Sequence, residues 1–141
     1  MRSHPKVLLL SSDETETRKL EEVLLEYAIL RRAGNLAELQ SKLEGEAYDA
    51  VFCGWSFHTG TWNDALGQVR QRCPDLPVVI FSETGDEREW VKVLEAGAFD
   101  LLIAPYQKHT VIPILEQAAA SYEARRLHST GSYLKASEKV D

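Results

Sequence analysis

The sequence has few of the features that mark membrane-spanning or nucleic-acid-binding proteins. It contains no apolar run near the ~20 residues that a helix needs to cross a bilayer. Lys and Arg total 16 against 22 Asp and Glu, which gives a formal net charge of -6. The basic residues are scattered, so no basic stripe is present to neutralise phosphates. We therefore expect a cytoplasmic protein that contacts other proteins, with no membrane and no direct nucleic-acid partner.

Cysteine is scarce as well, with two residues in the chain. Cys53 lies within an apolar run, and Cys73 follows a helical pattern. These surroundings suit two separate reduced thiols in a cytosolic domain, and they disfavour a disulfide.

What the sequence does contain is enough apolar material for one domain with a full core, since 44% of its 141 residues are hydrophobic. We assign this domain to residues 1–127. The periodic pattern fades beyond about Arg126, and residues 128–141 form a polar segment that is a linker, a helical extension or a docking segment. The sequence leaves these three open, and it also leaves open whether an output domain follows.

Five short apolar runs are typical of buried strands. Their residues are apolar at successive positions without polar alternation, which indicates strands covered on both faces, as in a parallel sheet between helices. The runs are Val7 to Leu10, Ile29 to Leu30, Ala50 to Cys53, Val78 to Phe81 and Leu101 to Ile103.

The segments between these runs have helical spacing, each with one apolar stripe. Three pairs place a capping residue three positions before an acid, which indicates helix starts: Asp13 with Glu16, Asn35 with Glu38 and Thr61 with Asp64. Pro113 falls in the first turn of the last helix if His109 or Thr110 caps that helix, where a missing amide hydrogen costs little. The stripes are Leu20, Val23, Leu24 and Tyr27; Leu36, Leu39 and Leu43; Trp62, Leu66, Val69 and Cys73; Trp90 and Leu94; and Leu115, Ala118, Ala119 and Tyr122.

Strand and helix thus alternate five times. Right-handed crossovers then favour a doubly wound α/β fold, a (βα)5 three-layer sandwich around an open five-stranded parallel sheet. The predicted strand order is 2-1-3-4-5.

Several segments in this order resemble the receiver domain of response regulators, the CheY-like family of bacterial two-component signalling. Tyr48-Asp-Ala-Val-Phe-Cys53 is similar to the third strand of that family and Pro77-Val-Val-Ile-Phe-Ser82 to its fourth. Gly97-Ala-Phe-Asp-Leu-Leu-Ile-Ala-Pro105 is similar to the fifth strand and the proline turn after it. The resemblance covers nearly the whole of residues 6–127.

The resemblance also implies which positions would carry the chemistry of the family. That chemistry uses an acidic pair after the first strand, a phosphoacceptor aspartate ending the third, a hydroxyl ending the fourth and a lysine just before the proline. An aromatic residue at a switch position accompanies them in many members. The positions that align with these are Ser11 and Ser12, Gly54, Ser82, Ala104 and, for the switch, Leu101.

These substitutions remove the phosphoryl chemistry. Neutral hydroxyls at Ser11 and Ser12 are weak ligands for Mg²⁺, which prefers anionic oxygens, and Gly54 offers no carboxylate for an aspartyl-phosphate. Asp49 cannot substitute, because at about 3.3 Å per residue it lies roughly 16 Å from Gly54, toward the other end of the sheet. We expect no metal, no cofactor and no enzymatic activity.

Two remaining acids keep an alternative open. Asp13 and Glu83 lie near the carboxyl ends of the first and fourth strands, where such sheets place their sites. A displaced carboxylate there would give a phospho-switch or a weak cation site. The simpler interpretation, which we favour, is that Asp13 caps the first helix and Glu83 is solvated.

The aromatic loop from Gly54 to Trp62 suggests a second alternative, a flavodoxin-like protein that stacks a flavin or nucleotide. The segment Ser11–Thr17 has hydroxyls but no glycine and three acids, which would repel a phosphate. We prefer the view that Trp55, Phe57 and Trp62 fill the space left by the missing acidic site. His58 and His109 lack partners at metal-ligand spacing, and Ser82 lacks a His/Asp partnership, so we expect neither zinc nor a serine nucleophile.

Trp90 is the main candidate for an interface. It lies on the expected fourth helix, which in receivers docks partners and dimerises together with the fifth strand and helix, and Trp is enriched in binding hot spots. Packing of Trp90 on the sheet with Leu94 explains the same spacing. The candidate interface residues are Arg88, Trp90, Lys92 and Tyr106.

The sequence therefore predicts a degenerate, non-phosphorylatable receiver that acts as a protein-interaction module in two-component-type signalling. The partner is a protein, with a homodimer through the fourth helix, fifth strand and fifth helix as one form of it.

Overall fold

The computed structural model describes residues 4–12, 14–57 and 60–140; side chains are described within these ranges except at positions 14, 16 and 128–140. Strands and helices alternate along the chain, as expected. The elements are β1 (Lys6–Leu10), α1 (Glu14–Leu25), β2 (Ile29–Ala33), α2 (Leu36–Gly45), β3 (Ala50–Gly54), β4 (Ser56–Phe57), β5 (Gly60–Thr61), α3 (Trp62–Arg72), β6 (Val78–Ser82), α4 (Glu87–Ala96), β7 (Asp100–Ile103) and α5 (Lys108–Val140).

The main sheet has five parallel strands in the order β2-β1-β3-β6-β7. This confirms the predicted order 2-1-3-4-5, with β6 and β7 as its fourth and fifth strands. A short antiparallel pair, β4 and β5, follows β3 and was not predicted. Its two-residue strands are too short to produce a periodic signal in the sequence.

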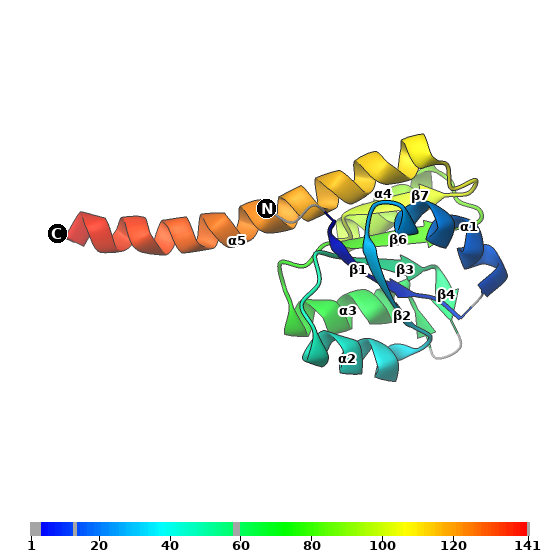
Figure 1. The fold of residues 1–141 in the computed structure, drawn as a ribbon, viewed down its shortest axis with the longest axis horizontal. Coiled ribbons are helices and arrows are strands. Elements are labelled where there is room, and N and C mark those ends of the chain that lie inside the picture. Colours follow the sequence, from blue (N-terminus) through cyan, green and yellow to red (C-terminus); the bar gives the residue numbers. More distant parts are fainter. Residues whose placement is uncertain (1–3, 13, 58–59, 141) are drawn as a thin grey trace.

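The helices cover both faces of the sheet, which makes three layers (Figure 1). One core holds Leu39 of α2, Trp62 and Val69 of α3 and Val93 of α4 against one face. The other core holds residues of α1 and α5, including Leu20 and Leu115, against the opposite face. The strands supply both cores, because successive side chains of a strand point to opposite faces.

Two of the three predicted caps are present. The Asn35 side chain accepts a hydrogen bond from the Glu38 amide at 2.8 Å, and Thr61 with Asp64 forms a capping box at the start of α3. Asp13 lies outside the described residues. The structure adds a cap that the sequence analysis missed, because Asp86 accepts from the Glu89 amide at 3.0 Å at the start of α4.

The last helix begins earlier than predicted, and it decides among the alternatives left open for the polar segment. It begins at Lys108, so Pro113 is its sixth residue and not part of the first turn. At that position proline removes a hydrogen bond to the carbonyl of residue 109. The helix also continues through the polar segment to Val140, which makes that segment a helical extension that projects from the domain (Figure 1).

A cluster of charged groups fastens the start of β1 to the loop before β3. The Glu46 carboxylate pairs with the Lys6 ammonium and, at 3.4 Å, with Arg31 Nε. The hydrogen bond from Lys6 lowers the pKa of Glu46. Burial, together with the nearby Glu46 charge, raises the pKa of Tyr48 to about 12. Among the helices described, none is long and apolar enough to cross a membrane.

Both cysteines are free thiols, as the sequence predicted. Cys53 is fully buried in β3, and burial raises the pKa of its thiol. Cys73 is partly exposed; burial raises the pKa of its thiol too, and the Arg72 charge partly offsets that effect.

We expect a disulfide-exchange reagent to titrate one thiol in the folded protein and two in denaturant, because only the thiol of Cys73 is accessible. Cys73→Ser should abolish the native reaction, whereas Cys53→Ala should leave it intact. Rapid reaction of two thiols in the native protein would contradict the burial of Cys53.

Candidate functional site

The parallel register brings the aligned positions to one edge of the sheet. Gly54 ends β3 and Ser82 ends β6, while Ser11 and Ala104 directly follow β1 and β7. The Ala104 amide donates to the Ser82 carbonyl at 2.9 Å, and the Ser11 amide donates to the Ala33 carbonyl at 3.0 Å. These positions therefore share the carboxyl edge, where parallel α/β sheets place their ligands.

Gly54 is buried, and its missing side chain is not forced by crowding. A Cβ at this position would lie 3.5 Å from the Phe81 ring and 3.6 Å from the Leu10 carbonyl oxygen, which are ordinary contacts. Its backbone dihedral φ is not positive, so the position does not require glycine. The chain could hold a larger residue here without rearranging the sheet.

Aromatic rings form the floor beside Gly54. Phe81 is fully buried, and Tyr106 is 3% exposed. Their ring centroids are 5.9 Å apart with an interplanar angle of 88°, an edge-to-face pair. The sequence named Tyr106 as a candidate interface residue; this is wrong because the ring points inward from the β7–α5 loop and is buried against Phe81. Phe81 was not foreseen as a site residue, since its position looks like an ordinary core position in β6.

The hydroxyl groups of the site are engaged locally. Thr17 is 2% exposed, and its hydroxyl donates to Ser11 Oγ at 3.3 Å. Ser82 Oγ donates to the Thr84 carbonyl at 2.6 Å and accepts from the Thr84 amide at 3.4 Å. Ser82 thus satisfies nearby backbone groups. Ser12 is half-buried at this edge.

Of the two acids that kept the phospho-switch open as an alternative, only Glu83 lies among the described residues. Glu83 is exposed in the loop after β6, and Asp13 lies outside the described residues. In the described part of the chain, no three His, Cys, Asp or Glu side chains are close enough together to hold a metal ion. Asp49 is at the opposite edge, as predicted, where its Oδ2 accepts from the Lys6 amide at 2.8 Å.

The aromatic loop packs away from the Gly54 position. Trp62 and Phe57 are 5% and 7% exposed and belong to the core under α2 and α3. Trp55 packs against this core and tilts against Trp62, with ring centroids 5.7 Å apart. Apart from the chain neighbours of Gly54, the ring nearest its missing Cβ is Phe81; that the loop aromatics fill the space left by the missing acidic site stays a prediction. His58 lies outside the described residues, and His109 is exposed.

The fourth helix turns its tryptophan outward. Trp90 is 44% exposed and the adjacent Val91 39%, whereas the buried residue of α4 is Val93. The Trp90 indole donates to Asp100 Oδ1 of β7 at 3.1 Å, so its ring lies over the α4–β7 boundary. Trp90 is thus partly exposed and partly packed against β7, and its role in an interface stays a prediction. Arg88 and Lys92 are also exposed.

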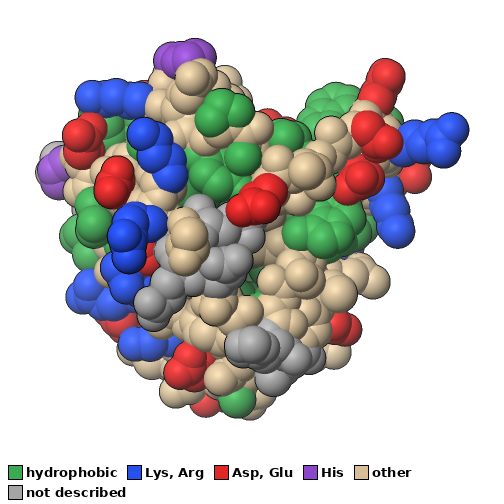
Figure 2. Space-filling model, turned by 90° about the vertical axis from the view of Figure 1, so that its right-hand side faces the viewer, with side chains coloured by type: hydrophobic (Ala, Val, Ile, Leu, Met, Phe, Trp, Pro, Cys, Tyr) green, Lys and Arg blue, Asp and Glu red, His purple; other side chains and the backbone are tan. Residues whose placement is uncertain are grey.

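The carboxyl edge and the α4 surface can be seen together (Figure 2). In this view, basic side chains gather on one side of the edge, and hydrophobic side chains lie on the other side among acidic and basic ones. The surface beside α4 thus combines apolar area with acidic and basic side chains.

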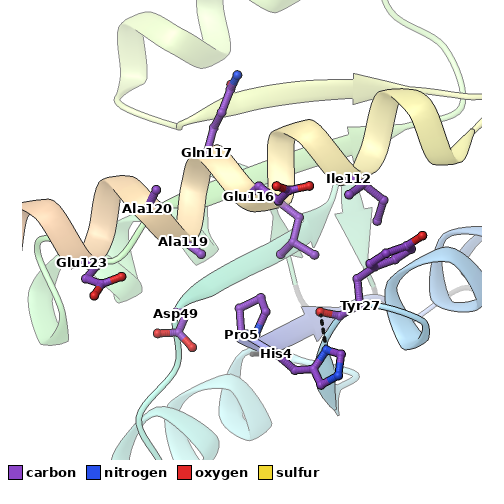
Figure 3. A pocket seen from close by; sticks show the side chains of 11 residues that line it. His4, Pro5, Tyr27, Asp49, Ile112, Glu116, Gln117, Ala119, Ala120 and Glu123 are labelled. Atoms are coloured by element: carbon purple, nitrogen blue, oxygen red, sulfur yellow. Dashed lines mark hydrogen bonds between the residues drawn. The ribbon is translucent and has the colours of Figure 1, made fainter. Parts of the chain in front are cut away.

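A cavity that the sequence did not predict lies at the opposite, amino edge of the sheet. A cavity of about 620 Å³ opens between the start of β1, Tyr27 and α5. His4 Nδ1 lies 3.3 Å from the Tyr27 carbonyl at its rim (Figure 3). Asp49, Glu116 and Glu123 also line it. No sequence signal could find this cavity, because it forms only where α5 crosses the amino end of β1.

We expect Gly54→Ala to change the free energy of unfolding by less than about 1 kcal/mol, because the added Cβ makes ordinary contacts and the φ angle permits alanine. Phe81→Ala is the matched comparison and should cost about 3–5 kcal/mol by leaving a cavity in the floor. Urea denaturation of both variants measures the difference. A severe loss for Gly54→Ala would show that glycine is required structurally.

Comparison with known proteins gives consistent relatives. No family model matches the chain. Over 99 residues the chain is 31% identical to the response regulator protein PilR of Pseudomonas aeruginosa, covering 69% of the chain and 22% of PilR. It is 22% identical over 133 residues to the transcriptional regulatory protein KdpE of Staphylococcus aureus, covering 92% of the chain and 57% of KdpE. The chain thus spans less than two thirds of these relatives.

Solved structures show the same fold. The signal receiver domain of an HD domain-containing protein from Pseudomonas fluorescens superimposes with a TM-score of 0.78 at 19% identity, covering 89% of the chain and 94% of that domain. The beryllofluoride-activated NtrC4 receiver domain dimer gives a TM-score of 0.75 at 20% identity, covering 83% of the chain and 98% of that domain. Both are receiver domains, and the match covers nearly all of each.

Proposed function

We propose that this chain, which its sequence similarity and CheY-like fold place among response-regulator receiver domains, works without phosphorylation. In this proposal it is a protein-interaction module in two-component-type signalling. It is not an enzyme in this proposal. The observation that carries the proposal is Gly54, which occupies the carboxyl end of β3 where the family has its phosphoacceptor.

The surroundings of Gly54 support the loss of phosphorylation. Phe81 and Tyr106 make its floor apolar, while Ser11 and Ser12 present neutral oxygens. Neutral hydroxyls beside an apolar floor cannot replace the carboxylates that hold Mg²⁺. Ala104 has no ammonium group to pair with a phosphoryl oxygen.

A receiver that is not switched by phosphate must act through what its surface binds. The surface formed by α4, β7 and α5 carries Trp90 and Val91, exposed and adjacent, with Arg88 and Lys92 beside them. An aromatic anchor rimmed by charged residues is the arrangement that hot spots take. The NtrC4 receiver neighbour is a dimer, and we propose that this chain likewise self-associates or binds a protein partner through the α4–β7–α5 surface, in the cytoplasm.

Any regulation of the domain would then come from its partners. A partner that binds one conformer more tightly shifts the population toward that conformer by its differential affinity, without a covalent modification. The helical extension of α5 leaves the domain at its amino edge and would carry such a change to whatever follows.

Treatment with acetyl phosphate and Mg²⁺ should add no phosphoryl group to the intact protein, because no carboxylate occupies position 54. Intact-mass spectrometry measures this, with a receiver that has its aspartate as the positive control. A phosphoryl group mapped to Asp13 or Glu83 would favour the displaced phospho-switch and overturn this proposal.

Trp90→Asp should weaken self-association or partner capture from the native host at least about tenfold, because it removes the aromatic anchor and adds a charge. Analytical ultracentrifugation and pull-down measure the effect. Ile29→Asp is the matched control: Ile29 is 42% exposed, close to the 44% of Trp90, but lies on β2 at the other side of the sheet.

The stability of Trp90→Asp decides how that result is interpreted. Losing the indole hydrogen bond to Asp100 should cost about 1 kcal/mol. Trp62→Ala, at a buried position, should cost about 3–5 kcal/mol. Equal binding by Trp90→Asp and the wild type would rule out this surface.

A further inference from the structure

A second cavity, of about 420 Å³, lies at the amino edge of the sheet near the ends of α3 and α4. Its lining comes from four parts of the chain: α3, the turn before β6, the turn between α4 and β7, and α5. Two arginines line it, Arg70 from α3 and Arg125 from α5. This cavity lies at the opposite edge from Gly54, so it is separate from the site at the carboxyl edge.

The Arg70 guanidinium lies beside Gly97, in the space that a side chain at that position would take. Gly97 ends α4 with a φ of 106°, the left-handed conformation that favours glycine. A Cβ on Gly97 would overlap the guanidinium of Arg70. Because Gly97 has no side chain, the Arg70 guanidinium lies directly against the backbone of the α4–β7 turn. The positive charge carried by α3 is thereby placed beside that turn.

Arg70 and Arg125 differ from their neighbours in having no protein partner. Among the described residues, neither makes an ion pair, a hydrogen bond or a ring contact. Arg72, two residues after Arg70, pairs with Glu44 at 2.8 Å. Arg126, next to Arg125, lies over the Tyr122 ring at 5.4 Å.

The lining of the cavity contains no carboxylate. In a chain of net charge -6, this is a local concentration of unpaired positive charge. Two guanidinium groups on one cavity provide planar donor forks that match the geometry of phosphate or carboxylate oxygens.

The apolar residues of the lining present little surface to the cavity. Leu66, Leu76 and Pro77 are buried, and Phe99 is partly buried and packs against the core on the α1 and α5 side of the sheet. Polar atoms therefore supply most of the accessible lining, which suits a small anionic ligand. The volume of about 420 Å³ lies within the range of small-molecule sites.

We propose that this cavity binds a small phosphorylated ligand, with its phosphate on Arg70 and Arg125 and the rest of the ligand beside the turn between α4 and β7. A ligand held by both arginines links α3 to α5 close to the point where α5 leaves the domain. Occupancy would therefore restrain the direction of the helical extension. This goes beyond the proposed interaction role and does not depend on whether residue 54 can be phosphorylated.

The test is a titration of the full chain, followed by two-dimensional NMR that includes the arginine Nε–H signals. The probes are adenosine monophosphate, inorganic phosphate and adenosine. We expect saturable shifts of the Arg70 and Arg125 signals with adenosine monophosphate, weaker saturable shifts with phosphate, and no saturation with adenosine. We expect this order of affinities because the phosphate group supplies the charge that the arginines bind, whereas adenosine supplies only the uncharged part of the ligand.

Variants separate a built site from general attraction of anions. Arg70→Gln and Arg125→Gln should each weaken binding of adenosine monophosphate about tenfold or more, as expected for loss of a charge-assisted hydrogen bond. Arg72→Gln removes the same charge from the same helix but outside the cavity, and it should leave the affinity within about twofold. Circular dichroism checks that each variant is folded; Arg70 and Arg125 are exposed, so the fold should persist.

Three results would overturn the proposal. These are no saturable shift with either phosphate-containing probe, an equal loss of affinity in Arg72→Gln, and tighter binding of a short poly-glutamate peptide than of adenosine monophosphate. The last result would assign the cavity to the carboxylates of a protein partner.

Discussion

The pairing of β3 between β1 and β6 is the constraint on which the rest of the structure depends. Parallel hydrogen bonding fixes Leu10 beside Cys53 and Gly54 beside Phe81. The carboxyl ends of these strands must then lie together, and the loops that follow them must meet at one edge. Every property of the candidate site follows from which side chains that register brings there.

At this edge the chain has the framework of a receiver, and aromatic rings pack beside Gly54. Phe81 and Tyr106 pack edge to face below Gly54, and Ser82 closes a local turn through Thr84. A charged group buried beside this floor would need compensating partners.

In the proposed function, the domain acts through its surfaces. Trp90 is 44% exposed and donates one hydrogen bond to Asp100 of β7, which leaves part of its surface available to a partner. At the other edge, Gly97 lets the Arg70 guanidinium reach the cavity that Arg125 also lines. Both features use α-helices anchored on the same sheet, so binding at either one can bias the position of α4 or α5 without a change at residue 54.

The sequence by itself determined the layers, the strand order and the positions that align with the phosphoryl chemistry, because apolar runs, cap pairs such as Asn35 with Glu38, and strand-end motifs are local signals. It could not decide whether Trp90 faces the core, since one helical stripe fits either orientation until α4 is seated through Val93. Nor could it predict that the Tyr106 ring is buried or that α5 begins at Lys108. It also could not predict that Arg70 and Arg125 line the same cavity. Those outcomes depend on contacts between residues distant in the chain, and the packing of helices on the sheet creates them only once the whole domain is assembled.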